Sequence, residues 1–323
     1  MTSIQRAIAL GLAATVLQAL MLVAFAWPAV NLAPRDLPIA VAGPQSAQVT
    51  QRLHETSPGA FEISTLTDAE AARTALTDQE IYGAIVTGEG APRVMIASAA
   101  SPAVAQQLTA LAQQFSGAPA AVEDVVATAP DDPRGAGFGS MVLPLVMAGI
   151  AAGVLLTLLV PALGARLAGL LTFGIAGGLL STLVFHSWLS IVPGGFLELA
   201  AIAGLAGFSV AAAIVGLAAV LGRAGIGLGA LTMLLVGNPF SAATSAPELL
   251  PQPWGTLGQL CPPGAAASLL RSVAYFDGAG AARPLTVLLI WAAGGVALLG
   301  VGAVRARRSP GQIVEPDRAT VAA

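Results

Sequence analysis

The chain has 323 residues, of which 56% are hydrophobic and only 10% are charged, whereas about 25% of the residues of a typical soluble domain are charged. The net charge of -3 at pH 7 offers no basic face, so nucleic acid is excluded as a partner. All 14 basic residues are arginine, which excludes a Walker A lysine and a lysine Schiff base, and the single Cys261 excludes an intramolecular disulfide. This lysine-free, Ala- and Gly-rich composition is typical of a GC-rich bacterial genome.

Six apolar segments are long enough to cross a bilayer, because about 20 apolar helical residues span about 30 Å of hydrocarbon. Only Arg166, Glu198 and Arg223 are charged between residues 139 and 247. The six predicted membrane helices cover residues 7–27, 139–165, 167–188, 196–221, 224–243 and 284–304. We therefore predict an α-helical polytopic membrane protein, with residues 1–30 as the first helix and residues 139–304 as a five-helix bundle.

The first helix has an alternative interpretation as a cleaved signal peptide. Ala24-Phe25-Ala26 resembles a cleavage site, and Arg6 supplies a positive charge before the apolar run. The run of about 20 residues is longer than the 7 to 15 of an ordinary signal, and five further apolar segments follow it. These two features favour a retained membrane helix.

Residues 31–138 have the composition of a soluble domain and carry most of the acidic residues. Apolar and β-branched runs alternate with polar segments, which predicts a small extracytoplasmic α/β domain inserted between the first two membrane helices. The predicted strands are residues 37–42, 61–66, 82–87 and 93–97, with the last two joined by a turn at Gly88-Glu89-Gly90. The predicted helices are residues 45–56, 67–76 and 101–115, and residues 116–137 are expected to form a helix and a linker.

Arginine placement predicts the orientation, since short loops rich in arginine stay in the cytoplasm. One set of helix ends carries Arg6, Arg166, Arg223, Arg305, Arg307 and Arg308. The other set carries only Arg271 and Arg283. Both termini are therefore predicted to lie on the cytoplasmic side of a bacterial plasma membrane, and the polar tail of residues 305–323 is expected to be disordered.

The outer segment of residues 247–283 is rich in proline yet remains apolar, which predicts an interfacial or re-entrant loop. Two short helices are expected to begin near Trp254 and Pro263. In the second of them, one face is apolar and the opposite face carries Arg271 and Ser272. The apolar face consists of Leu269, Leu270, Val273 and Phe276.

No arrangement of residues predicts an active site, a cofactor site or a metal site, so we do not expect an enzyme. His54 and His186, the only histidines, are expected to be solvated or internally bonded. The pair Asp131-Asp132 lies in a Pro- and Gly-rich linker and is expected to be solvated rather than catalytic.

Glu198, Asn238 and Pro239 are the candidate residues for transport or gating, because polar groups within a bilayer are costly and often functional. Glu198 lies two residues into its predicted helix, so a carboxylate that simply reaches water is the alternative. Gly237-Asn238-Pro239 should break a helix, and capping of the freed backbone groups is the alternative role of Asn238.

Glycines recur at a spacing of four within the predicted membrane helices. Such pairs let helix backbones approach closely, which favours packing within the bundle or between chains. The pairs are Gly149 and Gly153, Gly174 and Gly178, and Gly225 and Gly229.

The order of these parts resembles the permeases of the ABC type 2 exporter family, in the branch with a large external domain after the first membrane helix. It is also similar to phage-infection-protein-like membrane proteins of Gram-positive bacteria. The local similarity lies in LPIAVAGP at residues 37–44, EIYGAIVTG at residues 80–88, and residues 237–278 from GNPFSAATSAPELLPQ onward.

The resemblance implies a half-transporter that forms a homodimer or heterodimer and works with a separate ABC ATPase to export a hydrophobic or amphipathic substrate. The chain departs from the family in its short N-terminal segment and in a cytoplasmic turn of only a few residues around Arg166, where a coupling helix is usual. Arg166, Arg223 and the tail would then be the ATPase contacts. The alternative is a non-transporting membrane scaffold of an envelope or secretion assembly.

Overall fold

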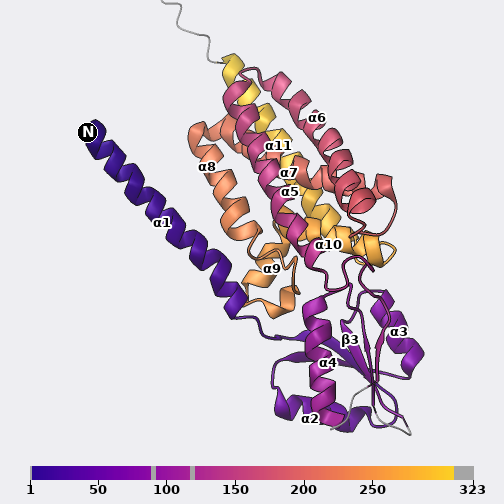
Figure 1. The fold of residues 1–323 in the computed structure, drawn as a ribbon. Coiled ribbons are helices and arrows are strands. Elements are labelled where there is room, and N and C mark those ends of the chain that lie inside the picture. The colour runs from indigo at the N-terminus through magenta and orange to yellow at the C-terminus, as the bar shows by residue number, and fades with distance from the viewer. Residues whose placement is uncertain (1, 89–91, 117–120, 309–323) are drawn as a thin grey trace, which may run out of the picture.

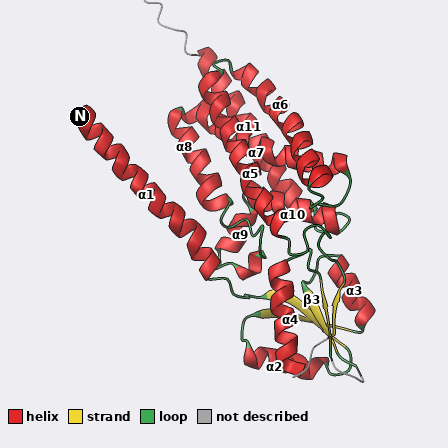
Figure 2. Ribbon diagram, in the orientation of Figure 1, coloured by secondary structure: helices red, strands yellow, loops and turns green. Residues whose placement is uncertain are grey.

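The computed structural model describes residues 2–88, 92–116 and 121–308. It is mostly helical, with a bundle of long apolar helices at one end and a small α/β unit at the other (Figures 1 and 2). Helix α1 (Ser3–Val30) meets the bundle only near its own C-terminal end and diverges from it elsewhere (Figure 1). We call the end of the bundle that carries the α/β unit the domain end, and the opposite end the far end.

The α/β unit contains a five-stranded sheet in the order β2-β1-β3-β4-β5. Strand β1 pairs in parallel with β2 on one side and with β3 on the other. Strand β4 is antiparallel to β3, and β5 pairs in parallel with β4. The strands are β1 (Leu37–Ala42), β2 (Phe61–Leu66), β3 (Gly83–Val86), β4 (Arg93–Ile96) and β5 (Ala121–Asp124). The first four confirm the predicted strands to within one residue at each end.

Helices cover both faces of this sheet, so strand residues alternate between two apolar layers. Helices α2 (Ser46–Thr56) and α4 (Pro102–Ser116) pack on one layer, and α3 (Ala69–Thr77) packs on the other. Leu249 reaches the first layer from the bundle side, and Phe276 reaches the second. Residues from the bundle side therefore contribute to the core on both faces of the sheet.

One prediction for this unit is wrong. Residues 116–137 do not form a helix and a linker in their described part, because residues 121–124 form β5 and residues 125–135 form the connection. The remaining residues 117–120 lie outside the described part, as do residues 89–91 of the predicted turn. Strand β5 is short and largely exposed, so the tertiary pairing with β4 defines it more than its own sequence does.

Five of the described helices are long and apolar enough to cross a membrane, the pattern of a multi-pass membrane protein. They are α1, α5 (Ala136–Leu159), α6 with its terminal π turn (Leu163–Trp188), α7 (Phe196–Leu221) and α11 (Ala282–Arg308). The predicted helix over residues 224–243 is instead α8 (Arg223–Leu231) and a π turn (Thr232–Gly237), together 15 residues. It ends before Asn238, because Pro239 has no backbone N–H and cannot continue the helix.

Other helix boundaries also differ from those predicted. Helix α5 stops at Leu159, six residues early, because Pro161 follows in the short connection to α6. Arg166 therefore lies in the first turn of α6 rather than in a loop. Helix α11 continues to Arg308, so the predicted tail loses its first four residues, and its remainder from residue 309 onward lies outside the described part.

Helix α7 is the centre of the bundle, and the three predicted glycine pairs all pack against it. A Cβ at Gly153 would press on Ile214, one at Gly178 on the backbone of Gly204, and one at Gly229 on Ile214. Each glycine thus allows a backbone approach that a larger residue would prevent. The glycine pairs act in packing within this chain.

Candidate functional site

A cavity of about 240 Å³ lies at the domain end, between the end of α1, the start of α5 and the segment that follows α8. Its polar lining comes from Asn238, Ser241, Thr244 and Ser245. Its apolar lining comes from Phe25, Pro28, Ala29, Leu32, Gly139, Val142, Leu143, Pro239, Ala242, Ala243 and Leu250. A mostly apolar pocket with a few convergent polar groups is the usual form of a ligand site.

Asn238 and Pro239, two of the predicted candidates, both line this cavity. The backbone N–H of Asn238 donates to Met233 O at 2.9 Å, which closes the π turn, and its carbonyl accepts from Ser241 N at 3.2 Å. Pro239 has no N–H and cannot continue the helix. The chain therefore leaves the helix here and places short polar side chains along the cavity.

Two following helices, α9 (Trp254–Gln259) and α10 (Pro262–Tyr275), donate hydrogen bonds to the backbone of residues 238–246. Gln259 Nε2 donates to Ser241 O at 2.9 Å, and its Oε1 accepts from Ser268 at 2.7 Å. Arg271 donates to Ala243 O at 2.9 Å, and its guanidinium lies 4.9 Å from the ring centre of Phe138. These bonds fix the cavity wall without using the side chain of Asn238.

The two short helices begin where the sequence predicts, at Trp254 and within one residue of Pro263. Arg271 and Ser272, predicted to lie opposite the apolar face of α10, are only 8% and 1% exposed, so that face is buried as well. Helix α10 packs against α7 and α11 and under the α/β unit, so it is buried on both faces. The hydrogen bond to Ala243 O and the cation–π contact with Phe138 stabilise the buried guanidinium of Arg271.

Three aromatic side chains contact one another beside the cavity, where α1 meets the segment that follows α8. The ring of Phe240 stacks on Trp254 of α9 at a centroid distance of 4.8 Å. Its edge meets Trp27 of α1 at 6.5 Å with an angle of 72°. Phe240 is only 5% exposed, so this contact joins α1 to the rest of the bundle.

Residues 248 and 249, next to Leu250 of the cavity lining, are tied to the α/β unit and to the segment that leads into it. The hydroxyl of Tyr82 donates to Glu248 Oε2 at 2.9 Å, and burial, followed by the charge of Glu248, raises the pKa of Tyr82 well above its usual value. Arg35 donates to Leu249 O at 2.8 Å, and Ala33 N donates to the same carbonyl at 3.0 Å. Movement of the α/β unit would therefore act directly on residues 248 and 249.

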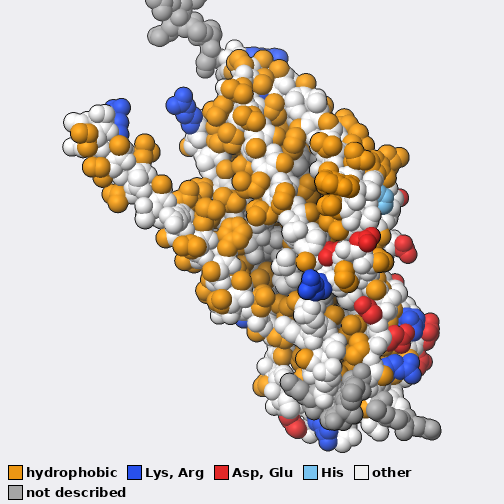
Figure 3. Space-filling model, viewed as in Figure 1, with side chains coloured by type: hydrophobic (Ala, Val, Ile, Leu, Met, Phe, Trp, Pro, Cys, Tyr) orange, Lys and Arg blue, Asp and Glu red, His pale blue; other side chains and the backbone are white. Residues whose placement is uncertain are grey.

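Away from this closure, α1 stands apart from the bundle, and Figure 3 shows the resulting apolar wedge between α1 and the part of the bundle that contains α8. None of the most apolar window of α1 is buried. Leu228 and Leu231 of α8 are 53% and 40% exposed. The wedge is open toward the far end and closed at the domain end by Trp27, Phe240 and Trp254.

The structure does not bring the other predicted site residues to this cavity. Glu198 is exposed in the first turn of α7, where a carboxylate is stabilised by the helix dipole. Arg166 donates to Val160 O at 2.7 Å and to Thr157 O at 3.0 Å, so it caps the end of α5. Arg223 is exposed at the start of α8.

Sequence reasoning missed one polar residue near the site. Asp132 is 7% exposed, and its carboxylate accepts from Phe138 N at 2.8 Å at the start of α5. The expectation of a solvated side chain is therefore wrong for Asp132, and its position a few residues before an apolar helix was the available signal. His186 is half-buried with Nδ1 2.8 Å from Val192 O, and His54 is exposed, as expected.

No group of three or more His, Cys, Asp or Glu side chains among the described residues is arranged to hold a metal ion. Comparison of the chain with protein-family models, with curated proteins and with solved structures finds no match. The cavity, its aromatic closure and the open wedge are therefore the features on which a function can be argued.

Proposed function

We propose that this chain is a permease-like membrane subunit of an ABC-type exporter, which works with a separate ATPase and moves a hydrophobic or amphipathic substrate. The observation that carries the proposal is the mostly apolar cavity, with its few polar groups, at the closed end of an apolar wedge. An amphipathic molecule in the bilayer would enter between α1 and α8 and place its polar group near Asn238, Thr244 and Ser245. Phe240 and its aromatic neighbours would form the gate that separates this position from the domain end.

The charge distribution supports an orientation for this exporter. All Asp and Glu side chains among the described residues lie in the α/β unit or at the domain end of the bundle, whereas Arg6, Arg166, Arg223 and Arg305 lie at the far end. By the positive-inside rule, the far end, where α1 begins and α11 ends, is cytoplasmic and the α/β unit is an extracytoplasmic domain of a bacterial plasma membrane.

A sixth membrane crossing is part of the same proposal. The 15 residues of α8 and its π turn rise about 22 Å, less than the roughly 30 Å of a hydrocarbon core. The segment of residues 238–246 completes the crossing, and its backbone is sheltered from lipid by α9 and α10, as irregular backbone at membrane depth must be. With an even number of crossings, both termini lie on one side.

A non-transporting membrane scaffold is the second candidate, and the far end of the bundle favours it. Only residues 160–162 connect α5 to α6, and Gly222 alone separates α7 from α8. Arg166 is engaged in capping α5, so among the described residues Arg6, Arg223 and the end of α11 are the basic groups left for a motor subunit. In this second function the α/β domain would anchor an envelope or secretion assembly.

Affinity purification from native membranes in mild detergent, followed by identification of bound chains and an ATPase assay, separates the two functions. The exporter proposal predicts a stoichiometric nucleotide-binding subunit and a homodimer or heterodimer of permease chains. Arg223→Glu should release that subunit, whereas Arg283→Glu, the matched change of an exposed arginine at the domain end, should not. Recovery of envelope or secretion components alone, without ATPase activity, would overturn the exporter proposal.

A further inference from the structure

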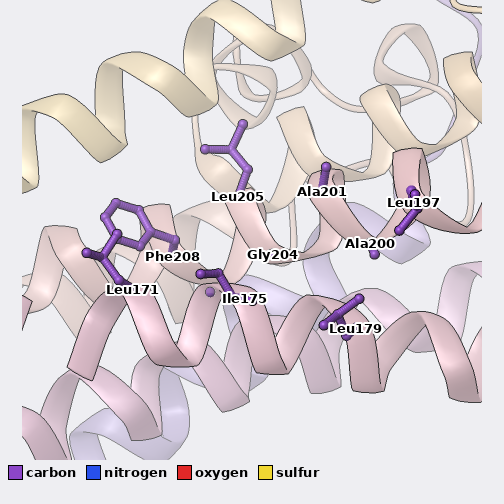
Figure 4. Close-up of a pocket in the computed structure, with 10 residues that line it drawn as sticks. Leu171, Ile175, Leu179, Leu197, Ala200, Ala201, Gly204, Leu205 and Phe208 are labelled. Atoms are coloured by element: carbon purple, nitrogen blue, oxygen red, sulfur yellow. The ribbon is translucent and has the colours of Figure 1, made fainter. Parts of the chain in front are cut away.

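A groove of about 390 Å³ lies between α6 and α7, and none of its residues line the cavity at Asn238. Figure 4 shows Leu171 and Phe208 at one end of the groove and Leu179 and Leu197 at the other. All of its lining residues are apolar. From these features we propose that the groove binds one acyl chain of a membrane lipid.

The sequence builds this groove through small residues in its floor and large residues in its walls. A Cβ at Gly204 would collide with the carbonyl oxygen of Gly174, so these glycines hold the two helices close together. Ala201, about one turn before Gly204 in α7, is exposed and leaves the floor open toward lipid. Ile175 and Leu205 rise on either side.

The length of the groove matches one leaflet of a bilayer. Leu197 and Phe208 are eleven residues apart in α7, which corresponds to about 16 Å along the helix axis. Half of a hydrocarbon core about 30 Å thick is about 15 Å. An extended hydrocarbon chain is much narrower than a helix, which is about 10 Å across. A lipid tail can therefore enter the groove, whereas a helix would contact only its edges.

Polar and interfacial side chains lie at the end where the lipid headgroup would emerge. Leu179 and Leu197 mark the domain end of the groove, because α6 runs toward the domain end and α7 begins there. Glu198 follows Leu197 directly, and Trp188, 77% exposed, ends the π turn after α6. Tryptophan and charged groups are typical of a membrane interface, which assigns the acyl chain to the leaflet nearer the α/β unit.

The test is native mass spectrometry of the full chain released from nanodiscs of phosphatidylethanolamine and phosphatidylglycerol, counting lipids retained per chain. Ala201→Trp fills the groove and should reduce the retained lipid by about tenfold, the effect of excluding about two methylene groups from apolar contact. Ala293→Trp, at an exposed alanine of α11 outside the groove, is the matched control and should leave the count unchanged. Equal retention by wild type and Ala201→Trp would overturn the proposal.

A second measurement identifies the occupant. A phospholipid with a diazirine on its acyl chain should cross-link to the peptides that contain residues 171–179 and 197–208. Because Cys261 is the single cysteine and is buried, Ala201→Cys introduces one reactive thiol on the groove. Efficient disulfide formation between two chains at this position would show that a second copy covers the groove and would overturn the lipid assignment.

Discussion

Helices α1 and α7 are nearly equal in length and apolarity, yet they pack in opposite ways. Their most apolar windows have mean hydropathies of 2.3 and 2.2, while 0% of the α1 window and 67% of the α7 window is buried. Glycines from α5, α6, α8 and α11 meet α7, whereas nothing lies within 4 Å of a Cβ at Gly11 of α1. Hydropathy therefore predicts which helices enter a membrane, and small residues at facing positions decide which of them pack together.

The largest effect is expected at the glycine contacts of α7. Gly204→Leu should lower the free energy of unfolding by more than about 4 kcal/mol, because its side chain would overlap the backbone of Gly174, which cannot rotate away. Denaturation of the detergent-solubilised chain measures this change. Gly11→Leu in α1 is the matched control and should change stability by less than about 0.5 kcal/mol. Similar losses from both substitutions would show that α1 packs as tightly as α7.

A smaller effect is expected where α1 does touch the bundle. Phe240→Ala should cost about 3 kcal/mol, since it removes a buried ring that stacks on Trp254 and meets Trp27. Unfolding curves give this value, and electron paramagnetic resonance between spin labels on α1 and α8 should show a broader distance distribution. Leu257→Ala, at an exposed leucine of α9, should change neither measurement. An unchanged label distribution in Phe240→Ala would mean that the ring is not what holds α1.

The same contrast explains which parts of the fold could be predicted from the sequence. Strand β1 and helix α7 are local patterns, one of β-branched and apolar residues and the other of uninterrupted apolarity, and both were predictable. Strand β5 depends on pairing with β4, so its four residues carry little signal of their own. The end of the fifth apolar segment was misplaced because the residues after Asn238 remain apolar while they leave the helix.

The candidate site was predictable only where one stretch of chain defines it. The sequence Gly237-Asn238-Pro239 predicts a helix break, and in the structure Asn238 and Pro239 line the cavity. The opposite wall includes Pro28 of α1 and Leu143 of α5, which are far from Asn238 in the sequence. Nothing in the sequence around either residue predicts that it lies beside Asn238. Glu198 was predicted as a candidate from its sequence position alone, but it does not line the cavity. A carboxylate in the first turn of a helix is stabilised by the helix dipole and needs no ligand.

The smallest effect is expected at the link between the α/β unit and the segment that holds α1. Tyr82→Phe removes the hydrogen bond to Glu248 and should cost about 1 kcal/mol near pH 7. The pKa of Tyr82 is raised in the folded chain, so its contribution is complete below the unfolded value of about 10 and is lost as pH rises above it. The unfolded chain then releases the phenol proton first, and the free energy of unfolding of the wild type falls by up to about 1.4 kcal/mol per pH unit, a loss that the variant does not share.

Unfolding of both chains at pH 8 and pH 11 measures the difference in the free energy of unfolding between them, which should shrink or reverse at the higher pH. A constant difference across that range would mean that Tyr82 ionises equally in both states and does not hold the α/β unit to residue 248.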